Sequence, residues 1–163
     1  MRIEGRCHCG NISFNLDWAG ELPEIPARAC TCSFCVKHGG VWTSNAGAAL
    51  EVTIEDPALR TRYQFGTRTA EFHVCARCGA VPLVTSRIDG KTYAVVNVNT
   101  FENVEPAQLR RAAVSFEGED TVARLDRRTR NWIRSVRFVD QRGDAGLKPA
   151  PETGTMSASG PVA

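Results

Sequence analysis

Apolar and polar residues alternate in several short stretches of the chain. Ile12–Leu16, Leu50–Ile54 and Ala70–Val74 each carry apolar side chains at every second position. A period of two is typical of β-strands that bury one face and expose the other. The pattern therefore predicts a mostly β protein.

Turn residues between the alternating stretches predict hairpins. Asp89-Gly90 is a strong turn dipeptide, and Gly10 can adopt the left-handed backbone angles that a tight turn requires. We expect hairpins over residues 2–17, 60–74 and 81–99, a further strand over 41–44, and a loop over 18–27, which contains one glycine and two prolines.

The periodicity weakens after Pro106. Residues 107–111 predict one helical turn. Residues 129–136 predict a short helix with Trp132, Ile133 and Val136 on one face.

The composition changes again near the C-terminus. From residue 141 onward Gly, Pro, Ser, Thr and Ala dominate and large apolar residues are few. Such a segment cannot bury enough apolar surface to offset the entropy lost on ordering. We therefore expect one folded domain over residues 1–140 and a flexible tail over residues 141–163.

Charge and hydropathy exclude some classes of function. The net charge of +2 is too small to predict a nucleic-acid partner. The arginines of residues 124–137 are expected on the polar face of a helix, because aromatic residues for base stacking are sparse there. Residues 1–6 lack the apolar core of a secretory signal, and no run of about 18 apolar residues predicts a membrane span. We expect a cytoplasmic protein.

Seven cysteines are the main chemical feature of the chain, and their number is odd. Disulfides alone cannot use an odd number, and tight clustering favours metal ligation over crosslinking. The cysteines fall into three groups: Cys7 and Cys9, then Cys30, Cys32 and Cys35, then Cys75 and Cys78. Thiolates at such spacings are the usual ligands of structural and catalytic Zn²⁺.

The first and last groups can form one site. Cys7 with Cys9 and Cys75 with Cys78 each make a short knuckle beside a predicted strand, and two knuckles supply the four thiolates of a closed zinc site. Such a site would join distant parts of the chain, so its binding energy would also be folding energy. The alternative is two buried cysteine pairs without a metal.

The middle group, Cys30, Cys32 and Cys35, supplies only three thiolates. A structural zinc site closes its fourth position with protein, whereas a catalytic site leaves that position to water or substrate. His38 follows Cys35 by three residues and could close the site. We expect His8 and His73 to be surface or hydrogen-bonding histidines.

The complete cysteine pattern resembles that of the glutathione-dependent formaldehyde-activating enzyme family, which includes centromere protein V. The resemblance spans residues 3–135 and rests on C-x-C-G from Cys7, C-x-C-x-x-C from Cys30 with Gly39 after it, and C-x-x-C-G from Cys75. It implies a single-domain β-tent, in which antiparallel sheets are joined by zinc knuckles, with a short C-terminal helix. His38 does not belong to the family motif.

The resemblance also implies two zinc ions per chain. A structural zinc would bind Cys7, Cys9, Cys75 and Cys78, and a catalytic zinc would bind Cys30, Cys32 and Cys35. The implied activity is a carbon–sulfur lyase reaction, as in S-(hydroxymethyl)glutathione synthase, with glutathione as the small thiol substrate.

The residues around the middle group leave the function open between two classes. Arg28 and Lys37 flank the three cysteines and could bind the carboxylates of glutathione. If His38 closes the site, the chain is instead a non-enzymatic zinc module that binds a protein partner, as Rab-exchange chaperones of similar fold do.

Overall fold

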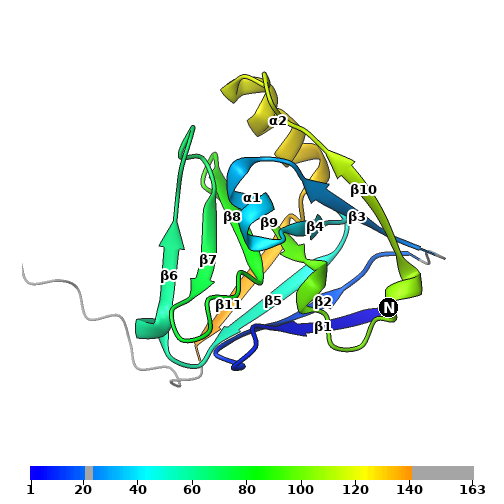
Figure 1. The fold of residues 1–163 in the computed structure, drawn as a ribbon, viewed down its shortest axis with the longest axis vertical. Helices are drawn as coiled ribbons and strands as arrows, with labels where there is room; N and C mark the ends of the chain where they lie inside the picture. Colours follow the sequence, from blue (N-terminus) through cyan, green and yellow to red (C-terminus); the bar gives the residue numbers. More distant parts are fainter. Residues whose placement is uncertain (21–23, 141–163) are drawn as a thin grey trace, which may run out of the picture.

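The computed structural model describes residues 1–20 and 24–140, and in these residues eleven strands form two sheets (Figure 1). The four-stranded sheet has the order β1-β2-β5-β11, with β1 (Arg2–Arg6), β2 (Ile12–Asp17), β5 (Ala49–Ile54) and β11 (Ser135–Asp140). The seven-stranded sheet has the order β10-β3-β4-β9-β8-β7-β6, with β3 (Ile25–Cys30), β4 (Val41–Thr43), β6 (Arg60–Tyr63), β7 (Glu71–Cys75), β8 (Leu83–Ile88), β9 (Lys91–Asn97) and β10 (Leu109–Val114).

Two α-helices lie in the upper half of the view in Figure 1, α2 at the top and α1 below it. They are α1 (Ser33–His38) and α2 (Thr121–Asn131). Short 3₁₀ turns cover Pro57–Leu59, Val98–Thr100 and Pro106–Gln108. The mostly β, single-domain fold expected from the sequence is confirmed.

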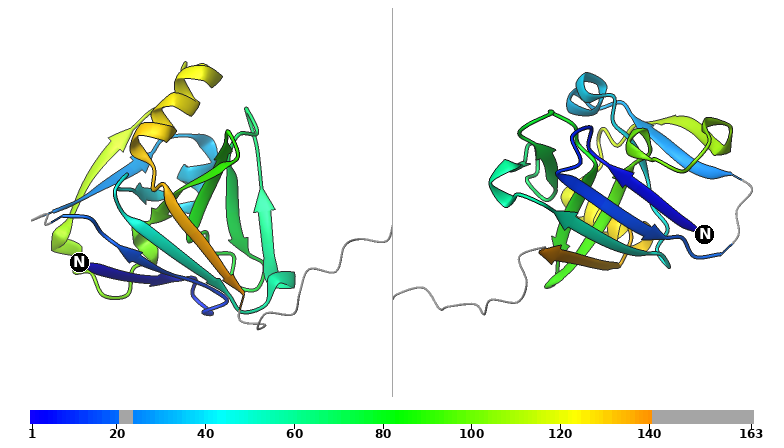
Figure 2. Two further views of the ribbon diagram at one scale, coloured as in Figure 1. Left: turned by 180° about the vertical axis from the view of Figure 1, so that it is seen from behind. Right: turned by 90° about the horizontal axis from the view of Figure 1, so that it is seen from below.

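The alternation along the strands builds the core. Ile12, Phe14 and Leu16 of β2 are all buried, and they pair in register with buried residues of β5. Each such side chain contributes about 1.5–3 kcal/mol when it leaves water. The largest cluster of buried residues draws on both sheets, so the sheets share one core (Figure 2).

The predicted hairpins are confirmed by the strand register. β1 pairs with β2, β6 with β7 and β8 with β9, all antiparallel. Asp89 and Gly90 have φ angles of 48° and 76°, the left-handed values of a two-residue turn that matches strand twist. Two edge strands depart from the expected antiparallel arrangement, since β10 pairs with β3 and β11 with β5 in parallel.

Three expectations about local structure are wrong, and two of them concern the segments around β3 and β10. The loop expected over residues 18–27 ends before β3, which begins at Ile25. The helical turn expected over residues 107–111 is mostly strand β10, because residues 109–114 complete the hydrogen bonding of β3.

The C-terminal helix also lies elsewhere than predicted. It begins after Asp120, whose carboxylate accepts a hydrogen bond from the backbone N–H of Ala123, and it ends at Asn131. Ile133 instead makes a β-bridge with Ala94, and β11 follows. Long-range strand pairing therefore overrode the weak helical period of residues 129–136.

The expected flexible tail, residues 141–163, lies outside the described residues. Among the described residues, no helix has the length and apolar character needed to span a bilayer.

Gly5 provides the first testable feature of the fold. A Cβ atom at this position of β1 would lie 2.7 and 2.8 Å from two ring carbons of Phe14, a buried residue that packs edge-on against Phe101. Gly5→Ala should therefore lower the free energy of unfolding by about 1–3 kcal/mol through overpacking. Urea unfolding measures the change. The exposed neighbour variant Glu4→Ala should stay within about 0.5 kcal/mol of the parent, and equal losses in the two variants would contradict the packing explanation.

Candidate functional site

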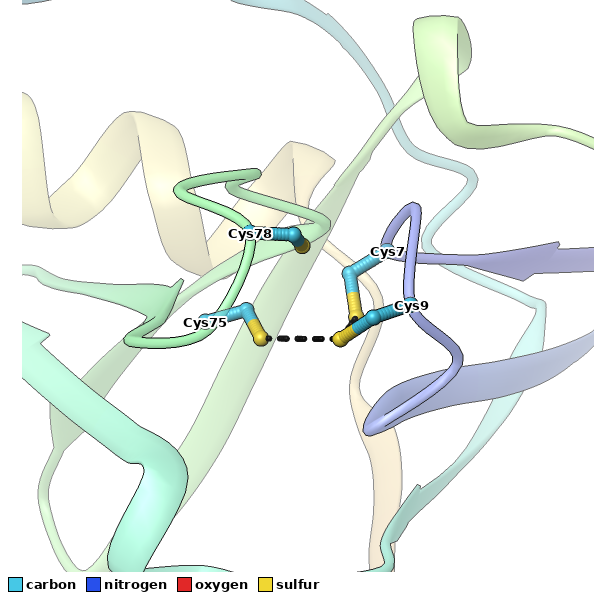
Figure 3. Close-up of side chains that lie close together, drawn as sticks. All are labelled: Cys7, Cys9, Cys75 and Cys78. Carbon is cyan, nitrogen blue, oxygen red and sulfur yellow. Dashed lines mark hydrogen bonds between the residues drawn. The ribbon is translucent and has the colours of Figure 1, made fainter.

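The knuckles from the two ends of the cysteine pattern meet in space (Figure 3). Cys7 and Cys9 lie in the turn between β1 and β2, whereas Cys75 ends β7 and Cys78 lies in the turn that follows. Their four Sγ atoms all lie within 4.8 Å of one another. The cluster thus connects a turn of the four-stranded sheet to a turn of the seven-stranded sheet.

The local backbone brings these thiols together. Gly10 and Gly79 adopt φ angles of 83° and 74°, which lets each turn fold back tightly. The backbone N–H of Ile12 donates to Cys7 Sγ at 3.3 Å. N–H groups that point at sulfur favour its thiolate form and are common around metal-bound cysteines.

The four thiols form no disulfide with one another; Cys7 and Cys75 are buried, and Cys9 and Cys78 are half-buried. Cys9 Sγ lies 3.7 Å from Cys7 Sγ and 3.4 Å from Cys75 Sγ, well beyond the roughly 2.05 Å of a disulfide. Burial raises the pKa of Cys7 to about 12 and also raises the pKa of Cys75. A bound cation compensates such thiolates for the loss of water. The cluster could therefore hold a metal ion with four protein ligands.

The middle three cysteines form a second, separate cluster. Cys30 ends β3, Cys32 is the N-cap of α1, and Cys35 lies within that helix. The Sγ of Cys32 accepts a hydrogen bond from the backbone N–H of Cys35 at 3.5 Å, so the cap itself places two of the thiols. The three Sγ atoms lie within 4.8 Å of one another.

Helix α1 is not among the helices expected from the sequence. The helix runs to His38, and Gly39 ends it in the left-handed conformation with φ 59°. This single helical turn folds the third thiol back toward the first.

The second cluster favours negative charge on Cys30. A hydrogen bond from the Cys35 thiol lowers the pKa of Cys30 to about 5, with a further contribution from the charge of Arg124. The same hydrogen bond, together with burial, raises the pKa of Cys35. The indole N–H of Trp42 donates to Cys35 Sγ at 3.2 Å and fixes its position. The arrangement suits a cation shared between the three sulfurs.

None of the described histidines belongs to either group of thiols. The ligand group of Cys30, Cys32 and Cys35 contains no histidine among the described residues. His38 is exposed, and its ring packs against Phe34 with the centroids 4.4 Å apart. His8 is exposed in its turn, and buried His73 shares a hydrogen bond of 2.9 Å with Thr85, as expected of non-ligand histidines.

A cavity of about 530 Å³ adjoins the second cluster, and all three of its cysteines lie on the wall. Other parts of the wall come from strands β3, β4, β8 and β9, from the β6–β7 hairpin, from the loop after β10, and from α2. Apolar residues of the wall include Trp42, Phe65, Phe72, Val84 and Val95.

Arginines give the cavity a cationic side. Arg124, Arg127 and Arg128 of α2 line it together with Arg28 of β3. Glu119 forms ion pairs with Arg124 at 3.7 Å and with Arg127 at 2.7 Å. Arg28 instead donates to the hydroxyl of Ser44 at 2.6 Å.

The sequence analysis missed the role of α2, since it assigned these arginines to a polar helix face. Their spacing of three and four residues was the available signal, because it places Arg124, Arg127 and Arg128 on one side of a helix. Arg28 faces the cavity as expected of a residue near the thiols. Lys37 is exposed on α1 and is not part of the cavity wall.

Fold and clusters together define a β protein with two thiol sites that could hold metal ions, one of them beside a cavity. The family model described as glutathione-dependent formaldehyde-activating enzyme matches residues 2–118. The chain belongs to this family. The match includes all seven cysteines and ends before α2.

Comparison with individual proteins adds little detail. A crystal structure of a Rhodobacter sphaeroides protein is 28% identical and covers 67% of this chain and 99% of its own, with a TM-score of 0.48. No curated protein matches the chain.

Two metal ions per chain are the expected occupancy, one in each cluster, because the thiols divide into groups of four and three. Elemental analysis of protein prepared without chelator, combined with thiol titration, measures it. His38→Ala should retain both ions, since the ring stacks on Phe34 outside the ligand group. Loss of one ion in His38→Ala would show that this histidine is a ligand.

The two clusters should differ in their effect on folding. Cys75→Ala removes one of the four thiols that meet between the two sheets and should destabilise the domain strongly, because a metal held there would be coupled to long-range contacts. Cys32→Ala affects ligands within one short segment, whose closure constrains the chain much less. Thermal unfolding of the two metal-loaded variants compares them. A lower melting temperature for Cys32→Ala than for Cys75→Ala would reverse the assignment.

Proposed function

We propose that the protein is a zinc-dependent carbon–sulfur lyase that reversibly joins glutathione to an aldehyde, as in S-(hydroxymethyl)glutathione synthesis. One observation carries the proposal: the cluster of three cysteines lies on the wall of a cavity and has no fourth ligand side chain among the described residues. A site with three protein ligands and access to a cavity is the arrangement of a catalytic zinc centre.

The donor set of both clusters fits zinc. Thiolate sulfur is a ligand that Zn²⁺ prefers, and four thiolates make a closed structural site. Cys7, Cys9, Cys75 and Cys78 are assigned this structural role, and Cys30, Cys32 and Cys35 the catalytic one. A zinc ion held by these three thiolates would supply Lewis acidity, which would lower the pKa of a substrate thiol.

The cavity wall suits glutathione, which carries two carboxylates. Arg28 is half-buried, and its hydrogen-bond partner Ser44 is neutral, so its charge is available to a ligand carboxylate. Desolvation, together with the neighbouring charge of Arg127, lowers the pKa of Arg28, as is typical of a cation that is poorly compensated by the protein.

In the synthetic direction, the glutathione thiol gives up its proton, its sulfur adds to the aldehyde carbon and a C–S bond forms. The π electrons of the carbonyl move to its oxygen, which takes up a proton, and the reverse steps cleave the adduct. The hydroxyl of Thr31 is held by the carbonyl of Val114 at 3.2 Å. Ser33 is exposed on the cavity wall and is our candidate to carry the proton.

The alternative of a non-enzymatic zinc module depends on closure of the second site by His38. The stacking of His38 on Phe34 supports the lyase over the module. The free thiols of both sites are consistent with a reducing compartment, so we place the protein in the cytoplasm. We assign the zinc-binding domain to residues 1–140.

Exchange spectroscopy by NMR tests the proposal, since it measures the rate at which glutathione and its formaldehyde adduct interconvert. The metal-loaded protein should accelerate this exchange over the uncatalysed rate. Cys32→Ala should abolish the acceleration because it removes a ligand on the cavity wall. The control Lys37→Ala, on the exposed side of the same helix, should retain it. Wild-type protein with both metals and no acceleration would refute the lyase function.

A further inference from the structure

Arg128 is the one residue of α2 that is buried, with 6% of its surface exposed. Its Nη1 donates to the carbonyl of Thr69 at 2.9 Å, to the hydroxyl of Thr69 at 2.8 Å and to the hydroxyl of Ser86 at 3.2 Å. The guanidinium also stacks on Trp132, with Cζ 4.9 Å from the ring centroid. The protein therefore holds this side chain in one place and orientation.

The positive charge of Arg128 lacks a carboxylate in contact among the described residues. Its hydrogen-bond partners are neutral oxygens, and its buried Nε has no partner there. The nearby carboxylate of Glu119 is paired with Arg124 and Arg127 instead. Burying a cation without a counter-charge costs free energy, which proteins usually avoid.

The charge persists at neutral pH. Burial, with the charges of Arg124 and Arg127, lowers the pKa of Arg128 to about 10, which still leaves the guanidinium protonated. Arginine gives up its proton with difficulty, so the cost of burial cannot be avoided by neutralisation.

Part of the guanidinium of Arg128 is left without a hydrogen-bond partner among the described residues. Arg128 lines the cavity together with the three cysteines of the second cluster. Its Nη2 makes no hydrogen bond to the described residues. Nη2 is also not one of their buried side-chain atoms that lack a hydrogen-bond partner, so it is accessible. A planar guanidinium with an open donor edge is suited to a carboxylate.

We propose that Arg128 binds a carboxylate of the ligand that occupies this cavity, and so selects carboxylate-bearing thiols for the three-cysteine site. This inference rests on the proposed function for the identity of that ligand as glutathione. It adds a specificity residue from α2, a segment that lies beyond the matched family region.

A purely structural role for Arg128 is the competing explanation, because its hydrogen bonds anchor α2 to the β6–β7 hairpin and β8. The two roles predict different responses to the ligand's charge. If Arg128 is only structural, its replacement should weaken the binding of all ligands of the cavity alike. If Arg128 contacts a carboxylate, the loss of affinity should depend on whether the ligand carries that carboxylate.

Calorimetric titration of the metal-loaded, full-length protein separates the two roles. The probes are S-methylglutathione and its two monoamides, in which either the glycine carboxylate or the glutamyl α-carboxylate is a carboxamide. Wild-type protein should bind one monoamide at least about tenfold more weakly than S-methylglutathione, the size expected for a hydrogen bond to a charged group. Arg128→Gln should bind S-methylglutathione more weakly than the wild-type protein does, by a similar factor. The variant should bind that monoamide no more weakly than it binds S-methylglutathione.

Arg134→Gln serves as the matched control, because Arg134 is exposed, donates to backbone carbonyls and lines neither hollow beside α2. It should keep the wild-type affinities and the wild-type preference. Three results would overturn the inference: no binding of S-methylglutathione to wild-type protein, equal binding of all three probes, or an unchanged preference in Arg128→Gln.

The probes have a blocked sulfur, so their binding does not require thiolate ligation. Binding with the predicted preference but no accelerated exchange of formaldehyde would refute the lyase and leave the carboxylate site standing. Accelerated exchange of formaldehyde without the predicted preference would refute the carboxylate site and leave the lyase standing.

Discussion

The close approach of two turns, 7–11 and 75–79, is the constraint on which the rest of the structure depends. The turns belong to different sheets, and each brings two thiols to a common point. Buried thiolates repel one another and are poorly solvated, so their position is stable only with a cation or with protons between them. A metal here would tie the sheets together at the edge of their shared core.

The second cluster depends on that framework without contributing to it in the same way. Its three cysteines come from one strand end and one helical turn, so they can assemble locally. The framework supplies what the segment lacks: the indole of Trp42 from β4, and a cavity wall from β8, β9 and the β6–β7 hairpin. The two clusters therefore differ in sequence separation: one joins two distant turns, and the other lies within one short segment.

Groups that favour opposite charges line the cavity beside the second cluster. The Cys30 thiol, which favours negative charge, lies on the same cavity wall as arginines of α2 and β3. Glu119 compensates two of these arginines, and the remaining cations, Arg28 and Arg128, have neutral partners. A ligand with both a thiol and carboxylates would satisfy both sides at once.

Local features of the sequence were sufficient to predict much of the fold and the division of all seven cysteines into two clusters. The alternation in β2, β5 and β7 and the Asp89-Gly90 turn depend on neighbouring residues, so they could be recognised without the tertiary structure. The spacing of the cysteines indicated two clusters for the same reason, since metal ligation imposes short, regular spacings.

Long-range pairing decided the rest. β10 and the start of β11 carry weak or misleading periodicity, and their strand conformation comes from hydrogen bonds to β3 and β5, which are distant in sequence. The burial of Arg128 likewise depends on contacts across the fold, with Thr69 and Ser86. The sequence therefore indicated how the cysteines group, but only the packing of α1 and α2 against the sheet determined which side chains surround them.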